Sequence, residues 1–263
     1  MQSNAPEVAT NTPGAAITTG ATASTKGSPV EIFAATNFDV WGVSLVLSEY
    51  GSGNTSSDAM LDFLIGSSGN EVPLIPNIVC GYSPLMIRLG VQRFWFPLFI
   101  PAGVRISARA AGRRTNTAMQ LQVFLTGGTL SPPWAVGSRV TTYGVTSVPL
   151  GTSIVAGNGT QGAWTEITAA TSEQHIFLVP SFQATNASVL ADRAISVGYG
   201  HGASGSEVLA GTVSYASSNS EQISTPGDVG AVETRIPAGT RLVMRASTSA
   251  SPDSYNGAIH GIT

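Results

Sequence analysis

The sequence is poor in charge. Asp, Glu, Lys and Arg make up 10% of its 263 residues, well below the usual quarter. Lys26 is the only lysine and the formal net charge is −3, so no basic field exists that would attract nucleic acid. Gly, Ser, Thr, Ala and Asn fill the polar positions instead. A surface solvated by hydroxyls and amides suits a protein held in a larger assembly better than a free metabolic enzyme.

Cysteine and long apolar runs are also scarce. Cys80 is the only cysteine, so no internal disulfide can form, and we expect a small buried apolar side chain there. The longest apolar run, Phe94 to Ile100, is too short to span a bilayer and contains Pro97. Met1 to Thr25 lacks the basic and apolar regions of a secretory signal. These features predict a chain that is made in a cytoplasm and needs no membrane.

Helix patterns are missing as well. No stretch has the periodicity of an amphipathic helix of three turns, whereas several short segments have strand-like composition and are bounded by turn residues. In the first half these segments are Val40 to Leu47, Met60 to Ile65, Val104 to Ala110 and Met119 to Leu125. The sequence therefore predicts an all-β fold.

One eleven-residue stretch occurs twice. Ile100 to Ala110 reads IPAGVRISARA, and Ile236 to Ala246 reads IPAGTRLVMRA, with seven identical positions and no gap. In both, a Pro-Ala-Gly turn leads into a strand, because Pro fixes φ and Gly adopts the unusual φ of the turn. The recurrence indicates an internal duplication.

Two further blocks recur in the same order at a separation of 135 to 136 residues. Glu31 to Thr36 matches Glu166 to Thr171, and Gly66 to Val72 matches Gly202 to Val208. The repeat is far longer than a solenoid unit, and each copy exceeds 100 residues, which is enough to bury a core.

We therefore predict two tandem antiparallel β-sandwich domains, jelly-roll-like, with an extended N-terminal arm. The predicted boundaries are 1–28 for the arm, 29–130 for domain 1, 131–144 for a Pro-rich linker and 145–263 for domain 2. Thr160 to Gly162 echoes Thr25 to Gly27, which suggests that part of the arm is the opening strand of domain 1.

Candidate chemical sites are weak. Gly200 to Gly205 spells G-x-G-x-x-G, but no helix pattern follows, so a turn is expected rather than a phosphate site. The three histidines, His175, His201 and His260, match no zinc spacing. Loops could gather carboxylates into a calcium site or an acid/base pair, but no ligand ladder supports this; the residues concerned are Asp39, Glu49, Asp58, Asp62 and Glu71. We predict no catalytic, cofactor-binding or metal-binding residues and no cofactor.

Some rare charges recur in both copies. The recurring pairs are Glu31 and Glu166, Glu71 and Glu207, Arg105 and Arg241, and Arg109 and Arg245. Recurrence in a charge-poor chain favours ion pairs common to both folds. A shared ligand site is the alternative.

The chain resembles structural proteins of tailed-bacteriophage virions. The resemblance rests on the Ser/Thr/Ala-rich arm, the two tandem sandwiches, the few charges and the Ile-Pro-Ala-Gly-x-Arg turns at Ile100 to Arg105 and Ile236 to Arg241. It is greatest for head-decoration, collar and tail-associated fibre proteins. It implies a non-enzymatic subunit that works as a symmetric homo-oligomer, contacts other capsid or tail proteins and resides in the virion after synthesis in the host bacterial cytoplasm.

A receptor-binding or carbohydrate-binding module is the alternative function. Polar loops such as Gly51 to Ser57 and Ala216 to Gly230, together with an exposed aromatic side chain, could then recognise a host-surface glycan. Domain-sized β-sandwiches are compatible with both functions, and the sequence leaves this choice open.

Overall fold

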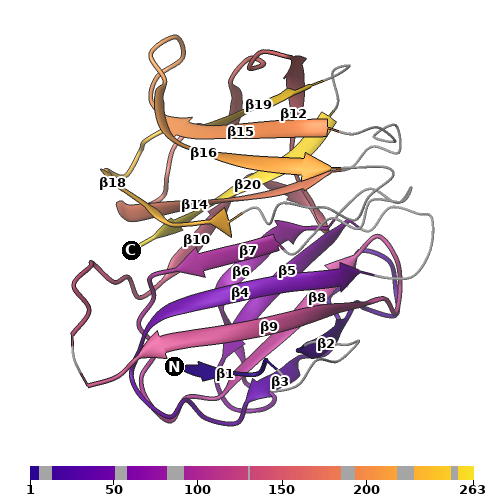
Figure 1. The fold of residues 1–263 in the computed structure, drawn as a ribbon, viewed down its shortest axis with the longest axis vertical. Helices are drawn as coiled ribbons and strands as arrows, with labels where there is room; N and C mark the ends of the chain where they lie inside the picture. Colours follow the sequence, from indigo (N-terminus) through magenta and orange to yellow (C-terminus); the bar gives the residue numbers. More distant parts are fainter. Residues whose placement is uncertain are drawn as a thin grey trace.

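The computed structural model describes residues 1–5, 14–50, 58–81, 92–129, 131–184, 193–217, 228–249 and 254–263. Every helix or strand assigned in these residues is a β-strand (Figure 1), which confirms the all-β prediction. Within the same residues, no helix is long and apolar enough to span a membrane.

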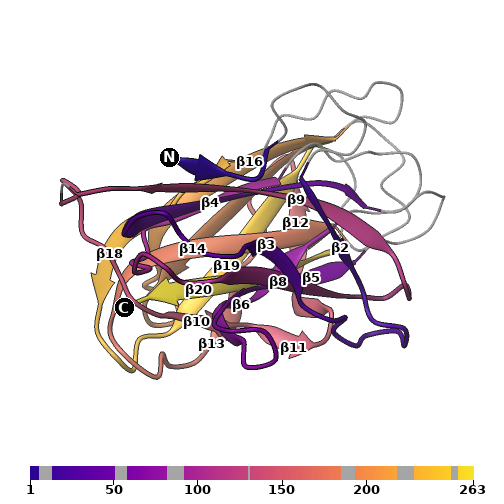
Figure 2. The same cartoon turned by 90° about the horizontal axis from the view of Figure 1, so that it is seen from below.

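The first copy, residues 1–129, folds into two sheets. One has the order β1–β9–β4–β7, with β2 also on β9, and the other has the order β3–β8–β5–β6. Seen from below, β4 and β9 lie in one layer and β3, β8, β5 and β6 in the other (Figure 2). The strands are β1 (Gln2–Ser3), β2 (Ala15–Thr18), β3 (Val30–Phe33), β4 (Val40–Tyr50), β5 (Ala59–Ile65), β6 (Val72–Cys80), β7 (Gln92–Phe96), β8 (Ile106–Gly112) and β9 (Ala118–Gly127).

The second copy, residues 131–263, repeats this arrangement. Its strands pair in the orders β12–β20–β14–β18, with β10 also on β20, and β13–β19–β15–β16, and the far end of β12 links the two sets through β19. The strands are β10 (Val140–Tyr143), β11 (Val145–Ser147), β12 (Leu150–Asn158), β13 (Thr165–Thr168), β14 (His175–Ala184), β15 (Arg193–His201), β16 (Val208–Ser217), β17 (Asp228–Val229), β18 (Val232–Ile236), β19 (Leu242–Thr248) and β20 (Ser254–Ile262).

Both copies are jelly rolls. With the eight principal strands of a copy counted in chain order from β2 or β12, one sheet has the order 1–8–3–6 and the other 2–7–4–5, as in a doubled Greek key. The first strand also touches both sheets in both copies. Thr19 forms a parallel bridge to Ala110, and Ala156 pairs in parallel with Ala246. The predicted tandem jelly-roll architecture is confirmed.

Strand periodicity places the core. Phe94 and Phe96 are fully buried between the sheets of the first copy, whereas Trp95, between them, is only partly buried on the outer face. Val43 and Leu45 of β4 alternate in the same way with Ser44. The side chains follow the two-residue period of a half-buried sheet.

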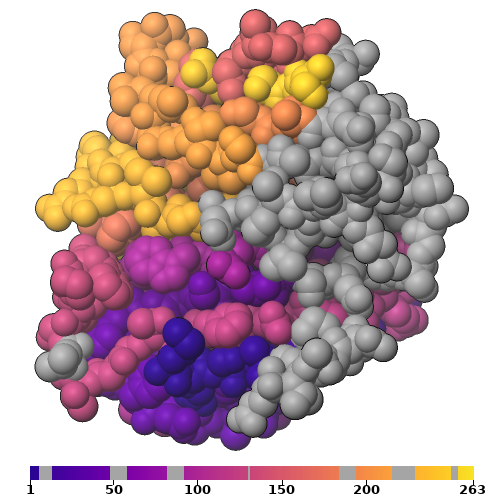
Figure 3. All heavy atoms as spheres, viewed as in Figure 1, coloured from indigo at the N-terminus to yellow at the C-terminus, as the bar shows by residue number. Residues whose placement is uncertain are grey.

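Strands occur inside the predicted arm and the predicted linker. Gln2–Ser3 and Ala15–Thr18 pair with β9 of the first copy, and Val140–Tyr143 pairs with β20 of the second. In Figure 3 the indigo atoms of the N-terminal strand lie against pink atoms of β9. The sheets of both copies therefore extend beyond the boundaries predicted from composition, because Ala, Thr and Ser supply strands once a neighbouring sheet provides hydrogen bonds.

A buried threonine fixes the repeated Pro-Ala-Gly turn in each copy. The Thr36 hydroxyl donates to Pro101 O at 2.7 Å and accepts from Val104 N at 3.1 Å. Thr171 makes the equivalent bonds to the second turn, at 3.1 and 3.2 Å. Gly103 and Gly239 have φ of 82° and 81°, which explains the shared Gly of the repeat.

Replacing Thr36 or Thr171 by Val is expected to lower the free energy of unfolding by about 1–3 kcal/mol in either copy. The methyl group matches the hydroxyl in size, but it leaves a buried carbonyl and N–H without a partner. Urea unfolding measures the change, and the exposed Thr126→Val serves as the control. Equal losses in all three variants would contradict the role of the hydroxyl.

Candidate functional site

The recurring charges form one three-residue clamp in each copy. Arg105 Nε lies 2.8 Å from Glu31 Oε2, and its Nη1 lies 2.8 Å from Glu71 Oε1. In the second copy the corresponding distances, from Arg241 to Glu166 and Glu207, are 2.7 and 3.0 Å. The predicted ion pairs are confirmed for the three residues of each clamp.

Each clamp joins a turn to two strands. Glu71 Oε2 also accepts from Gly69 N at 2.9 Å, and Glu207 Oε2 from Gly205 N at 3.0 Å. Hydrogen bonds from its own backbone, from Arg105 and from Gly69 keep the pKa of Glu71 below its ordinary value. The Gly200 to Gly205 stretch is therefore the end of β15 followed by a turn tied to Glu207. All the charges of the clamp are paired with one another, which favours a structural role.

The fourth recurring pair, Arg109 and Arg245, has diverged. Arg109 Nε lies 2.9 Å from Asp62 Oδ2, and Lys26 Nζ lies 2.8 Å from Asp62 Oδ1. The second copy has Gly198 where Asp62 stands, and the Arg245 guanidinium instead lies 4.2 Å from the ring centroid of Trp164. An ion-pair cluster in one copy is replaced by a cation–π contact in the other.

Asp62 is ionised although it is buried. Burial alone would raise its pKa, but Lys26, the Asn77 N–H and Arg109 together outweigh burial and lower it. Burial lowers the pKa of Lys26, and Asp62 offsets this only in part. The carboxylate therefore holds the N-terminal segment, through Lys26, against β5 and β8.

The remaining candidate carboxylates lie apart. Asp58 is buried and its Oδ2 lies 3.1 Å from Arg113 Nη2; burial raises its pKa to about 6, against the effect of Arg113. Asp39 is partly exposed and accepts from Ala102 N, and the side chain of Glu49 lies outside the described residues. In the part of the chain that is described, no three His, Cys, Asp or Glu side chains converge as metal ligands.

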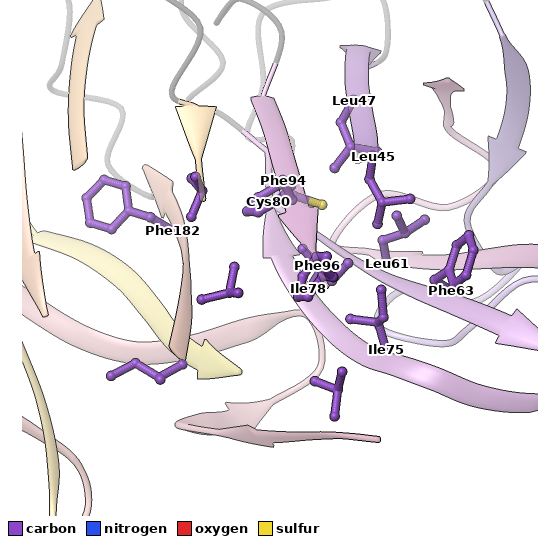
Figure 4. Close-up of a cluster of buried hydrophobic side chains, with 14 of the residues drawn as sticks. Leu45, Leu47, Leu61, Phe63, Ile75, Ile78, Cys80, Phe94, Phe96 and Phe182 are labelled. Atoms are coloured by element: carbon purple, nitrogen blue, oxygen red, sulfur yellow. The ribbon is translucent and has the colours of Figure 1, made fainter. Parts of the chain in front are cut away.

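The two copies meet at a seam between β6 and one sheet of the second copy. β6 packs against β10, β14 and β20, and β17 pairs in parallel with β7. One hydrophobic core runs through both copies, and Figure 4 shows side chains from Leu61 and Phe63 in the first copy to Phe182 in the second. Met60, Val79 and Ala258 form a smaller cluster at the seam.

Side chains of the second copy satisfy the backbone of this edge strand. Val79 N donates to Ser181 Oγ at 3.2 Å, and Thr142 Oγ1 donates to Pro76 O at 2.5 Å. Gln183 Nε2 donates to Cys80 O at 2.8 Å and also to Ala59 O of the neighbouring β5 at 3.2 Å. A buried edge strand needs such partners because each unpaired backbone group costs the loss of its hydration.

His260 connects Ser181 and Thr142. Its Nε2 and Nδ1 lie 2.9 Å from the hydroxyl oxygens of Ser181 and Thr142 respectively. Since the Thr142 proton is donated to Pro76, Thr142 must accept from Nδ1–H, and Ser181 must then donate to Nε2. A directed chain of hydrogen bonds thus runs from Val79 N to Pro76 O through Ser181, His260 and Thr142.

This chain of bonds fixes His260 in its neutral form. Nε2 accepts the Ser181 proton, so a second ring proton has no acceptor there, and burial lowers the pKa of His260 to about 3. His175 is also buried, beneath Tyr143, whose hydroxyl lies 2.8 Å from Nε2. Burial, with a smaller contribution from Arg139, lowers the pKa of His175 to about 4.

The histidines and the cysteine have separate surroundings. His201 ends β15, apart from the hydrogen-bond partners of His175 and His260. Cys80 is buried as predicted, and burial raises the pKa of its thiol to about 12, so the thiolate that would react is not formed near neutral pH.

Aromatic rings gather on the outer face beside the seam. Trp41 stacks on Phe99 with centroids 5.0 Å apart, and Trp95 meets Trp134 edge-on at 6.1 Å. Phe99 and Trp134 are 37% and 40% exposed, whereas Phe94, Phe96, Leu98 and Ile100 of the same segment are fully buried. The segment Phe94 to Ile100 therefore supplies both buried side chains and outward rings. The loop Gly51 to Ser57 and most of Ala216 to Gly230 lie outside the described residues.

Sequence reasoning missed the polar residues of the seam. Ser181, Gln183 and His260 lie in β14 and β20, and their partners Val79, Cys80 and Thr142 lie more than 100 residues away in the sequence. The signal in the sequence was weak: each is a polar residue at a position of β14 or β20 that the strand pattern does not assign to solvent.

Comparisons with known proteins identify no family. No family model and no curated protein matches the chain. Solved structures with weak likeness include the tandem CBM22-1–CBM22-2 domain of Paenibacillus barcinonensis Xyn10C, with TM-score 0.27, 11% identity and coverage of 93% of this chain and 85% of that one. The structure of the infectious bursal disease virus Gx strain has a TM-score of 0.22 and 11% identity. The VP2 subviral particle of infectious bursal disease virus has a TM-score of 0.22 and 15% identity. Both viral matches cover 86% of this chain and 57% of the other.

Asp62→Asn is expected to lower the free energy of unfolding by about 3–5 kcal/mol, because it leaves Lys26 and Arg109 without their counter-charge. Thermal and urea unfolding measure the loss. The partly exposed Asp39→Asn is the control and is expected to change stability by less than about 1 kcal/mol. A loss at Asp62 no greater than at Asp39 would show that the cluster is not coupled.

His260 is expected to make stability depend on pH. Its pKa is lower in the folded chain than the ordinary value of about 6.5, so below about pH 6.5 the unfolded chain binds a proton that the folded chain does not. The stabilising effect is complete above that pH and decreases toward about pH 3. His260→Gln should therefore cost stability at about pH 8, and the difference from wild type should shrink by about 2–3 kcal/mol at about pH 4.5.

Urea unfolding at several pH values measures this difference, and His201→Gln is the control because its ring lies apart from the bonds of the seam. A gap between wild type and His260→Gln that stays constant over this pH range would contradict a buried neutral imidazole.

Proposed function

We propose that the chain is a non-enzymatic structural subunit of a tailed-bacteriophage particle. It would assemble as a symmetric homo-oligomer on the capsid or tail, as a decoration, collar or fibre component, and would reside in the virion after synthesis in the host cytoplasm. Its partners would be further copies of itself and other virion proteins.

The observation that carries this proposal is the fusion of two jelly rolls into one body. The core is continuous across the seam, and the edge of β6 is hydrogen-bonded by Ser181, Thr142 and Gln183. Two sandwiches joined in this way cannot move independently without exposing apolar surface and unpaired backbone groups. A body of this kind transmits load and holds its outer faces in a fixed relation, as a particle component must.

The distribution of charge agrees with a structural role. The clamp residues and the Lys26, Asp62 and Arg109 cluster pair with one another. Most of the remaining polar surface consists of hydroxyl and amide groups, because only 10% of the chain is charged. Such a surface can be covered by neighbours at a lower desolvation cost than a charged one.

Carbohydrate binding is the second candidate, and the exposed rings of Phe99 and Trp134 favour it. Each exposed ring is held by a partner, Trp41 or Trp95, on the outer sheet face. Fixed aromatic faces that are partly open to solvent can stack on the apolar face of a sugar ring or on a peptide.

Quantitative mass spectrometry of purified particles tests the main proposal. We expect the chain at a fixed stoichiometry that survives high-salt washing, with copies in a multiple set by the symmetry of its location. Absence from particles that are otherwise complete and infectious would contradict the proposal.

A glycan array separates the second candidate from the first. Specific binding by the purified chain, lost in Trp134→Ala and retained in the exposed Val155→Ala, would indicate recognition of a host glycan by the aromatic face. Absence of specific binding by the wild-type chain would remove this candidate and leave the structural role.

A further inference from the structure

Each of the two faces that meet at the seam has a counterpart in the other copy. Because the copies share one topology, β5, β6 and β8 correspond to β15, β16 and β19, and the sheet β10–β20–β14 corresponds to β1–β9–β4. A second chain could in principle repeat the seam head to tail, with the outer face of its β15–β16–β19 strands on the next chain's β1–β9–β4 face.

We infer that the residues of these two counterpart faces disfavour this contact. The seam then forms once within a chain and does not propagate between chains. The inference deepens the structural role proposed above, on which its biological meaning rests. It states which contact neighbouring subunits do not use.

The apolar part of the seam lies on one face of β5, β6 and β8. On β5, Met60 pairs with Val79 and Ala111, so the three side chains share one sheet face, and all are fully buried. Met60 and Val79 form a cluster with Ala258 of the second copy, and Val145 and Val148 pack against this cluster. This face is the apolar part of the seam.

The matching positions of the second copy carry Ser196, Ser214 and Ser247. Register defines the match, because Ser196 pairs with Ser214 and Ser247 as Met60 pairs with Val79 and Ala111. Ser214 is exposed, and Ser196 and Ser247 are partly exposed. We call these three residues the serine face.

The serine face has hydrogen bonds of its own. Gln161 Nε2 lies 3.3 Å from Ser196 Oγ and 3.4 Å from Ser247 Oγ. β15 and β16 lie at the front of the second copy (Figure 1), and their orange atoms form open surface there in Figure 3. Covering these three positions with a second chain would bury three hydroxyls where the seam buries Met60, Val79 and Ala111.

The β1–β9–β4 face of the first copy lacks the histidine of the seam. His260 pairs with Thr142 and Val179, and at the matching positions Phe124 pairs with Ser3 and Ser44. Phe124 therefore replaces the imidazole that relays the hydrogen bonds of the seam.

The other relay residue is lost as well. Ser181 faces Ala258, and the matching pair in the first copy is Val46 and Gln122. A valine cannot accept from the N–H of an incoming edge strand. The β1–β9–β4 face thus has no equivalent of the chain of bonds through Ser181 and His260, and a docked strand would keep unpaired backbone groups.

The two faces differ from the seam in complementary ways. One has lost the apolar contact and the other has lost the polar one, so restoring one face alone would not rebuild the seam. Contacts between chains in an oligomer must then use other surfaces, such as the strand ends.

The test restores both faces in one chain. The substitutions Ser196→Met, Ser214→Val and Ser247→Ala copy the apolar side of the seam, and Val46→Ser, Gln122→Ala and Phe124→His copy the polar side. Mass measured by light scattering across a dilution series is compared with the wild type. We expect the restored chain to show a rise of about twofold or more in mean mass with concentration, since head-to-tail contacts either close into rings or continue as filaments.

A matched control introduces the same three apolar residues in exposed turns, and it is expected to keep the wild-type mass. Its substitutions are Ser67→Ala, Ser204→Met and Ser206→Val. Circular dichroism checks that each variant is folded. If the chain with all six substitutions is unfolded, the polar-side triple variant is mixed with the apolar-side triple variant instead. A complex that forms in the mixture, and that neither variant forms by itself, supports the inference.

Two results would overturn the inference. One is a restored chain, or a mixture of the two triples, whose mass equals that of the control. The other is a wild-type oligomer that Ser214→Asp dissociates, because the serine face would then be in use. Neither result bears on the presence of the chain in particles, and absence from particles would leave the mass measurement unaffected.

Discussion

A buried edge strand must have partners for its free backbone groups, and this constraint governs the whole molecule. β6 is an edge strand of nine residues in which only Pro73 and Pro76 lack an N–H donor. The second copy supplies side chains, rather than another strand, as partners for three backbone groups of β6, Val79 N, Pro76 O and Cys80 O. The chain of hydrogen bonds from Val79 N through Ser181, His260 and Thr142 to Pro76 O starts and ends on β6. Two domains that could have moved independently become one body.

The duplication shows which interactions the fold itself requires. The threonine that holds the Pro-Ala-Gly turn and the clamp of one Arg and two Glu recur with nearly the same distances in both copies. Interactions that depend on the position of a copy have diverged instead. Asp62 with Lys26 in one copy is replaced by Gly198 with Trp164 and Arg245 in the other. The buried Met60 at the seam is replaced by Ser196, which is partly exposed.

This division bears on function. Where the described residues carry charge, most of it is neutralised within the chain, and the buried histidines are held by hydroxyl neighbours. The copies differ at outward-facing positions, because these positions contact the other copy in one half of the chain and do not in the other half. A subunit whose two similar halves present different faces can contact different partners in a particle, and it need not polymerise through the contact that joins its own halves.

The sequence by itself determined the duplication, the all-β class and the tandem jelly rolls, because identical turn residues and two-residue periodicity are local signals that survive without coordinates. It also indicated the clamp pairs, since charges that recur in a charge-poor chain point to contacts that both copies share. Only the tertiary structure decided the role of Ser181, Gln183 and His260, which bind Val79, Cys80 and Ser181 respectively across more than 70 residues of sequence. The same holds for the strands inside the predicted arm and linker, where weak local propensity is overridden by the hydrogen bonds that β9 and β20 supply.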